Sequence, residues 1–163
     1  MYILSQIAAT ASTIILLVYS VMNVKRNTIL ICNIIINSLL AVHYLLLVNY
    51  TGALCSGVTA FMVYVFYYKN RLNNLVPTGF TILFLICGAL TWQDWWSVIP
   101  VMGNILLVIA LWNDNENIIK GIFIIVGLLW IILNIHLKSA ANVIGQILAV
   151  SGNIIYFIRK RRC

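Results

Sequence analysis

Seven long apolar stretches, separated by short polar breaks, run along the chain. They fall at about residues 3–22, 29–48, 52–68, 77–92, 95–112, 118–137 and 140–158. An α-helix needs about 20 consecutive apolar residues to cross a bilayer, and most of these stretches come close to that length. The pattern therefore predicts an all-α integral membrane protein with seven transmembrane helices.

The breaks between the stretches carry residues that favour the start of a helix. Side chains able to accept a hydrogen bond from a first-turn amide occur at five of them: Thr28, Thr51, Asp94, Asn117 and Ser139. Pro77 suits the first turn of the fourth helix. The fourth stretch is the shortest, because about 16 residues give only about 24 Å of helix.

Composition agrees with this pattern. The chain has 163 residues, of which 63% are hydrophobic and 8% charged, and its mean hydropathy is +1.05. A soluble domain carries about 25% charged residues, so most of this exterior must face lipid. Seven helices would use about 140 residues, which leaves no room for a domain outside the membrane. Soluble enzyme folds, zinc fingers and free-standing nucleic-acid modules are thereby excluded.

The net charge of +7 is distributed in small groups between the stretches, not in one patch, so no nucleic-acid partner is expected. Alternating the breaks between two sides puts nine basic residues on one side: Lys25, Arg26, Lys69, Arg71, Lys120, Arg159, Lys160, Arg161 and Arg162. Only Lys138 falls on the other side. Basic residues are retained in the cytoplasm, so this count predicts a cytoplasmic carboxyl end, an outer amino end and an odd number of crossings. The first charge is Lys25, so the first stretch lacks the basic region of a secretory signal and should be retained as a span.

The chain shows a weak internal repeat. A shift of 91 residues superposes Phe66 on Phe157 and Lys69 on Lys160. The first three and the last three helices would both begin outside the membrane, so the two triplets would be parallel repeats. We therefore expect a three-plus-one-plus-three plan like that of SWEET-type sugar facilitators. Its parts are a first bundle at 1–71, a linker helix at 72–94 and a second bundle at 95–163.

Polar side chains within two of the stretches form stripes about 40° wide on one helix face. One stripe consists of Asn142, Gln146 and Asn153, and the other of Asn33, Asn37 and Tyr44. A polar group in a bilayer must face protein or water, so two such stripes from opposite halves could line a conduit for a small neutral polar solute.

Asparagine also joins membrane helices by hydrogen bonds, and the chain is rich in this residue. Both roles stay open for the last stretch. For Asn33 and Asn37, and for the isolated Asn104 and Asn134, the structural role is favoured over solute binding.

Four further residues are candidates for gating. Pro100 and Gly103 could loosen the fifth helix as a hinge, or could produce a static kink. His43, like His136, lies near the outer end of its stretch and is either a capped or interfacial histidine or a pH-sensitive gate. Asp94, set among tryptophans, either caps a helix or captures a cation or sugar.

The central part of every stretch lacks Asp, Glu, Lys and Arg. Carriers driven by protons or sodium commonly use an intramembrane carboxylate, so passive or exchange-type movement is expected. The four cysteines, Cys32, Cys55, Cys87 and Cys163, show no metal-binding spacing, although Cys163 could be a palmitoylation site. The chain also lacks a recognisable catalytic order or phosphate loop. We therefore expect no metal, no cofactor and no enzyme activity.

Several landmarks occur in an order that resembles one family. They are His43-Tyr44-Leu45-Leu46-Leu47, Tyr50-Thr51-Gly52-Ala53, Val98-Ile99-Pro100-Val101-Met102-Gly103, Trp130 with Asn134, and Asn153-Ile154-Ile155 leading into Arg159. Over nearly the whole chain this set resembles the bacterial inner-membrane proteins of the YgjV type. That family is grouped with the SWEET, PQ-loop, nicotinamide-riboside-transporter and KDEL-receptor folds, so the resemblance implies the same helix plan. Relatives carry an Arg near the position of Met62 and a carboxylate in the last helix; this chain has neither, so no residue role is transferred.

The sequence thus indicates a small-solute transporter, a facilitator or exchanger, of the bacterial inner membrane. Its partners would be the lipid bilayer and a small neutral polar molecule. The alternative is a membrane receptor or assembly subunit that binds a ligand or protein without conducting it. A homo-oligomer stays open, although a chain with both halves needs no second copy to complete a path.

Overall fold

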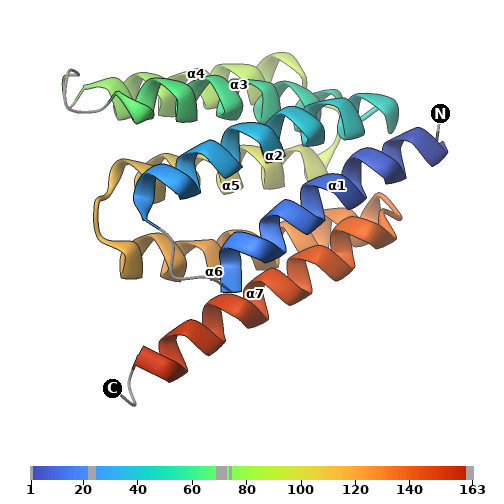
Figure 1. Cartoon of the computed structure of the whole chain (residues 1–163). Coiled ribbons are helices and arrows are strands. Elements are labelled where there is room, and N and C mark those ends of the chain that lie inside the picture. The colour runs from blue at the N-terminus through green and yellow to red at the C-terminus, as the bar shows by residue number, and fades with distance from the viewer. Residues whose placement is uncertain (1, 22–24, 69–72, 74, 161–163) are drawn as a thin grey trace.

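The computed structural model describes residues 2–21, 25–68, 73 and 75–160, and in these residues all regular structure is helical (Figure 1). The elements are α1 (Tyr2–Val21), α2 (Arg26–Leu46), α3 (Tyr50–Tyr67), α4 (Val76–Leu90), the short 3-10 turn η2 (Trp95–Ser97), α5 (Val98–Trp112), α6 (Glu116–His136) and α7 (Ala140–Lys160). Each predicted apolar stretch has become one helix, which confirms the all-helical class.

Five helical segments are long and apolar enough to cross a membrane by length and composition. They are α2, α3, η2 with α5, α6 and α7. The apolar part of α1 (Ile3–Val18) and the whole of α4 are shorter. With 15 residues, α4 is about 22 Å long. Multiple membrane-spanning helices are therefore supported, and the count of seven crossings stays a prediction.

Six helices pack in a closed series. In order, α1 packs on α2, α2 on α3, α3 on α5, α5 on α6, α6 on α7, and α7 returns to α1 (Figure 1). The short helix α4 packs on α3 and α5 and is not a member of the series. Large apolar side chains such as Leu4, Phe61 and Ile144 remain mostly exposed, as suits helices whose outer faces meet lipid.

The described basic residues concentrate at one end of the helix bundle. Lys25 and Arg26 stand at the start of α2, Lys120 near the start of α6, and Lys160 at the end of α7. Lys138 lies at the opposite end, in the turn between α6 and α7. The remaining basic positions used in the topology prediction, Lys69, Arg71, Arg161 and Arg162, lie outside the described residues, as does Cys163.

Three helix starts are capped by Asx side chains, but two of the three differ from the prediction. Asp94 is confirmed as a cap: its carboxylate accepts from the Trp96 amide at 2.9 Å and Ser97 completes a capping box. The caps of α3 and α6 are Asn49 and Asn115, not Thr51 and Asn117.

The starts of α2, α7 and α4 also agree with the prediction only in part. Thr28 lies inside α2, whose N-cap position is Lys25, so the prediction of a Thr28 cap was wrong. Ser139 directly precedes α7, and its backbone oxygen accepts the amide of Val143. Pro77 does occupy the first turn of α4. The Ser139 hydroxyl forms a contact between helices instead, with Nε2 of His43 on α2.

The ends of α2 and α6 are two copies of the same turn. Val48 and Lys138, 90 residues apart, both adopt the left-handed conformation, with φ of 60° and 54°. The amide after each donates back across the turn, Asn49 to the Tyr44 carbonyl at 3.0 Å and Ser139 to the Asn134 carbonyl at 2.9 Å. Both are Schellman motifs, which usually place glycine at the left-handed position. A valine, with its branched Cβ, is strained in this conformation.

Arg26 joins three segments at the basic end of the bundle. Its Nη2 donates to the Phe66 carbonyl at 3.3 Å and to the Leu111 carbonyl at 3.1 Å, and its Nε lies 3.4 Å from Asp114 Oδ1. Phe66 and Leu111 belong to the last turns of α3 and α5, where carbonyls lack helical partners. A single guanidinium therefore stabilises two helix C-termini and holds the α5–α6 loop against them.

The contact between α1 and α7 depends on the absence of a side chain at Gly145. A Cβ at this position would overlap the Thr13 side chain, whereas a Cβ on the exposed Gly57 of α3 would meet open space. Both glycines lie inside helices, where alanine is intrinsically favoured by about 1 kcal/mol.

We predict opposite effects for Gly145→Ala and Gly57→Ala. Gly145→Ala should lower the free energy of unfolding by about 1–3 kcal/mol, because α1 and α7 must move apart. Gly57→Ala should be neutral or stabilising. Thermal unfolding of the purified protein in detergent measures both, and equal stability of the two variants would disprove this α1–α7 packing.

Candidate functional site

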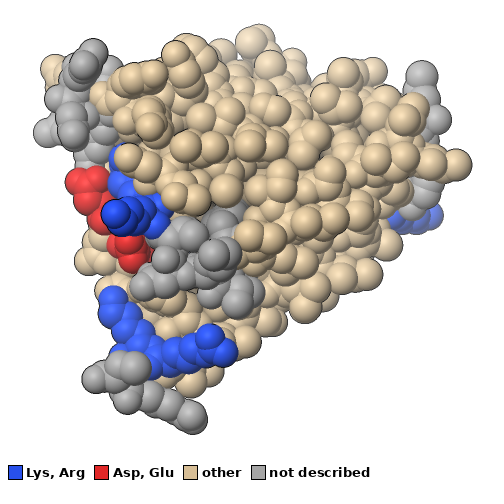
Figure 2. Space-filling model, viewed as in Figure 1, with Lys and Arg blue, Asp and Glu red and all other residues tan. Residues whose placement is uncertain are grey.

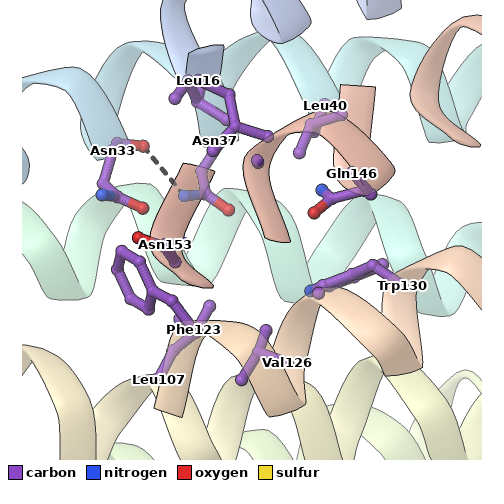
Figure 3. Close-up of a pocket in the computed structure, with 13 residues that line it drawn as sticks. Leu16, Asn33, Asn37, Leu40, Leu107, Phe123, Val126, Trp130, Gln146 and Asn153 are labelled. Carbon is purple, nitrogen blue, oxygen red and sulfur yellow. Dashed lines mark hydrogen bonds between the residues drawn. The ribbon is translucent and has the colours of Figure 1, made fainter. Parts of the chain in front are cut away.

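A cavity of about 60 Å³ lies among α1, α2, α5, α6 and α7. Its wall combines carboxamides from α2 and α7 with aromatic rings from α6 (Figure 3). The polar members are Asn33, Asn37, Gln146 and Asn153. Residues of both predicted stripes therefore line one cavity, on helices from opposite halves of the chain.

The two carboxamides from α7 are the distinctive feature of this cavity. Asn153 is only 4% exposed, and within the described residues neither it nor Gln146 makes a side-chain hydrogen bond. In Figure 3 both carboxamides point into the space between α2 and α6. An amide inside an apolar bundle needs a partner, so these two groups are suited to bind water or a polar solute there.

The carboxamides from α2, unlike those from α7, form hydrogen bonds within the protein. Asn37 Nδ2 donates to the Asn33 carbonyl at 2.8 Å (Figure 3). Asn33 Nδ2 donates to the Ile29 carbonyl at 2.9 Å. Backbone carbonyls of their own helix therefore take up the amide protons. The α2 carboxamides are therefore already bound within the protein, unlike the two from α7.

The two walls formed by α2 and α6 correspond position by position. The lining residues of α2 are Asn33, Ile36, Asn37 and Leu40, and those of α6 are Phe123, Val126, Gly127 and Trp130. Each pair is 90 residues apart, the same offset that relates the turns at Val48 and Lys138. The cavity is consequently bounded by equivalent faces of two helices, one rich in amides and the other in aromatic rings.

A hydrogen-bonded network lies next to the cavity. Asn134 binds three groups: the Tyr44 hydroxyl at 3.3 Å, Asn142 Nδ2 at 3.3 Å and the Trp130 carbonyl at 2.8 Å. The Tyr44 ring stacks on Trp130, with centroids 5.6 Å apart. Tyr44, Asn134 and Asn142 are all buried and do not line the cavity. Their observed contacts join α2, α6 and α7, which is the structural role considered for asparagine above.

His43 belongs to the same end of the bundle and is fully buried. Its Nδ1 lies 2.8 Å from the Ser5 carbonyl and its Nε2 lies 3.1 Å from Ser139 Oγ. A carbonyl only accepts, so Nδ1 carries the proton and Nε2 accepts from the serine hydroxyl. His136 is exposed and stacks on Trp96 at 4.2 Å. His43 thus links α1 to the α6–α7 turn, and a gating role for it stays a prediction.

The candidates on α5 lie outside the cavity. Asn104 accepts a hydrogen bond from Thr59 of α3 and donates to the Pro100 carbonyl at 2.7 Å. Pro100 stands in the first turn of α5, where its missing amide costs no helical hydrogen bond. Gly103 faces the Trp130 indole, and a Cβ at this position would be in ordinary van der Waals contact with the ring. Asp94 caps η2 as described, and gating by these residues stays a prediction.

Sequence reasoning missed the aromatic wall of the cavity. Phe123 and Trp130 are seven residues apart and therefore share one face of α6, but lipid-facing rings show the same spacing. The signal that could have identified them is their offset of 90 residues from Asn33 and Leu40. Arg26 was counted only as a topology marker, although its side chain joins two helix ends.

We predict that Asn134→Leu destabilises the protein and that Asn153→Leu does not. The first change removes three hydrogen bonds and leaves the Tyr44 and Asn142 side chains without their partner. At about 0.6 kcal/mol for each of the two bonds that join different helices, the loss should be at least about 1 kcal/mol. The second change removes a carboxamide without protein partners and should be nearly neutral. Thermal unfolding in detergent compares them, and equal losses would show that the two amides have the same role.

Comparison with known proteins identifies the family. The model of the Imp-YgjV family, described as bacterial inner membrane protein, matches residues 3–163. No curated protein and no solved structure matches the chain. The chain therefore belongs to the Imp-YgjV family and is a multi-pass protein of the bacterial inner membrane.

Proposed function

We propose that this Imp-YgjV family member is a transporter that lets a small neutral polar solute cross the bacterial inner membrane. The observation that carries the proposal is the pair of carboxamides, Gln146 and Asn153, which face the cavity without protein partners among the described residues. A purely structural amide would be expected to bind a neighbouring helix, as Asn134 does. The alternative is a receptor that binds such a solute without conducting it.

The proposed architecture has seven crossings in a three-plus-one-plus-three arrangement. Two observations support it: the closed series of six helices with α4 outside it, and the recurrence of the same turn and the same lining positions after 90 residues. In this arrangement α1–α3 and α5–α7 are parallel repeats and the solute passes between them, as in other transporters built from repeats. The amino end is outside and the carboxyl end is cytoplasmic, because the basic residues lie at the carboxyl end of the bundle.

In the proposed transporter, two groups of contacts would close the path on its two sides. Toward the proposed outer face lies the network of Tyr44, Asn134 and Asn142, and toward the proposed cytoplasmic face Arg26 pairs with Asp114. A dry cavity that binds benzene has about 150 Å³, so about 60 Å³ holds a few water molecules or a very small solute. A solute of sugar size therefore requires the halves to move apart, with one closure opening at a time.

The chemistry of the wall favours a neutral solute. Lys, Arg, Asp and Glu are absent from its lining in the described part of the chain, which offers amides, aromatic rings and aliphatic side chains. A charged solute would lose its hydration here without a counter-charge. Movement is then a passive or exchange process, and the chain acts without cofactor or catalytic chemistry.

We predict that Asn153→Leu and Gln146→Leu each reduce solute flux about ten-fold, the effect of losing about 1.4 kcal/mol of hydrogen bonding to the solute. Proteoliposomes containing the full chain, tested against neutral sugars, nucleosides and vitamins by counterflow, provide the measurement. Ser151→Ala is the matched control, because Ser151 lies on the same helix and is exposed. Within the described residues its hydroxyl donates only to the Ile147 carbonyl of that helix.

Three outcomes of this experiment are informative. Flux that falls in the two cavity variants but not in Ser151→Ala supports the transporter. Binding of a panel member without flux, lost in the same two variants, replaces the transporter with the receptor. Equal behaviour of all variants with a transported solute would place the path elsewhere.

We predict that residue 138 faces the outside and residue 25 the cytoplasm. In a chain whose four cysteines are replaced by alanine, Lys138→Cys should react with a membrane-impermeant maleimide in cells whose outer membrane alone is permeabilised. Lys25→Cys should react only after the inner membrane is opened. Both side chains are exposed, so accessibility in the folded protein does not bias the comparison. The reverse labelling pattern would overturn the proposed orientation.

A further inference from the structure

A cationic cluster that the proposed transport path does not use lies where α6 begins and α7 ends. The Nζ of Lys120 lies 4.0 Å from the centroid of the Tyr156 ring, and the Nζ of Lys160 lies 5.7 Å from the same centroid. Lys120 is only 3% exposed and packs beneath the ring, whereas Lys160 is exposed. Two ammonium groups from different helices therefore share one aromatic ring.

Hydrogen bonding in this cluster leaves donors in excess. Asn117 Oδ1 accepts from Lys160 Nζ at 2.8 Å and from the Tyr156 hydroxyl at 3.3 Å. Lys160 has further N–H donors beyond this bond, and Asn117 Nδ2 has no hydrogen-bond partner among the described residues. The exposed face of the cluster thus presents N–H donors and a positive charge.

Positive charge is in excess around the cluster. Arg159 is exposed one residue before Lys160 at the end of α7. The carboxylate that acts on Lys120 is Glu116, one helical turn earlier. Three cations therefore accompany one carboxylate, and the described blue residues near the carboxyl end form the corresponding patch in Figure 2.

The position of the cluster identifies the ligand class. Glu116 is the first residue of α6 and Lys160 the last of α7, so the cluster lies where two membrane helices leave the hydrocarbon and meet the lipid phosphates. Tyrosine and snorkelling lysine are typical of this depth. We propose that Asn117, Lys120, Tyr156 and Lys160 form a binding site for the phosphate of an anionic phospholipid headgroup. Lys160 and Asn117 contact the phosphate, and Lys120 supplies charge from behind the ring.

The other basic residues at this end differ from the cluster. The guanidinium of Arg26 is engaged by two backbone carbonyls and Asp114. Lys25 is exposed just before α2, and the structure shows neither a ring nor a second ammonium beside it within the described residues. General attraction of basic residues to an anionic leaflet would act on Lys25 as it does on Lys160. A specific binding site would instead depend on Lys160 and not on Lys25.

The proposal is tested with the full-length protein in detergent, titrated with phosphatidylglycerol or phosphatidylcholine and followed by native mass spectrometry and thermal unfolding. The wild type should retain and be stabilised by phosphatidylglycerol more than by phosphatidylcholine. Lys160→Gln and Lys120→Met should each weaken this retention about five-fold, the effect expected for one cation near an anionic lipid surface. Lys25→Gln is the matched control and should change it little.

Each alternative outcome decides against the site. Equal weakening by Lys25→Gln and Lys160→Gln would reduce the effect to general surface attraction. Stabilisation by inorganic phosphate that removes the response to phosphatidylglycerol would assign the cluster to a free anion and overturn the proposal of a lipid ligand.

If Lys120→Met fails to fold, Lys160→Gln and Asn117→Ala still test the site, because both positions lie at the edge of the cluster. The proposal is independent of transport, so a protein inactive in flux can still satisfy it.

Discussion

A polar group inside a membrane protein must find its partner within the protein or in water that the protein encloses, because lipid offers none. This constraint separates the amides of the chain into two sets. Asn104, Asn134 and Asn142 are satisfied by neighbouring helices and hold the bundle together. Asn153 and Gln146 lie on the same helix as Asn142 but face a cavity instead. Whether an amide joins two helices or faces a cavity therefore depends on what lies opposite it along α7, and not on residue type.

Much of the fold could be predicted because hydrophobic length and charge distribution act directly on a membrane protein. All seven helices correspond to apolar stretches. The helix caps were harder, because a threonine or asparagine near a helix start has two competing uses. Thr51 donates to the Thr91 carbonyl and Asn117 accepts from α7, so caps are supplied by Asn49 and Asn115 just before them. Tertiary contacts that the local sequence does not contain decided between these uses.

The sequence predicted which face of α7 carries the polar residues, but not which of them reach the cavity. Helical periodicity places Asn142, Gln146 and Asn153 on one face, yet Asn142 meets Asn134 while the other two reach the cavity. Periodicity within one helix carries no information about how far a neighbouring helix extends beside it. The aromatic wall was missed for a related reason: Phe123 and Trp130 differ from lipid-facing residues only through the rotation of α6 in the bundle. That rotation is determined by packing, including the approach of α5 at Gly103 and of α7 at Gly127.

The equivalence of the α2 and α6 walls has a consequence for how a ligand could be held. Two identical triplets facing each other would present the same surface twice, and a bound molecule could then sit in either of two orientations related by the symmetry axis. A single chain that carries both triplets is free to mutate one surface independently. Here Asn33 and Asn37 of α2 occupy the positions equivalent to Phe123 and Gly127 of α6. The two surfaces therefore differ, and the two orientations of a bound molecule are no longer equivalent. In the proposed transporter, an amphiphilic molecule would have one favoured orientation, its hydrogen-bonding groups toward the amides of α2 and α7 and its apolar side toward the rings of α6.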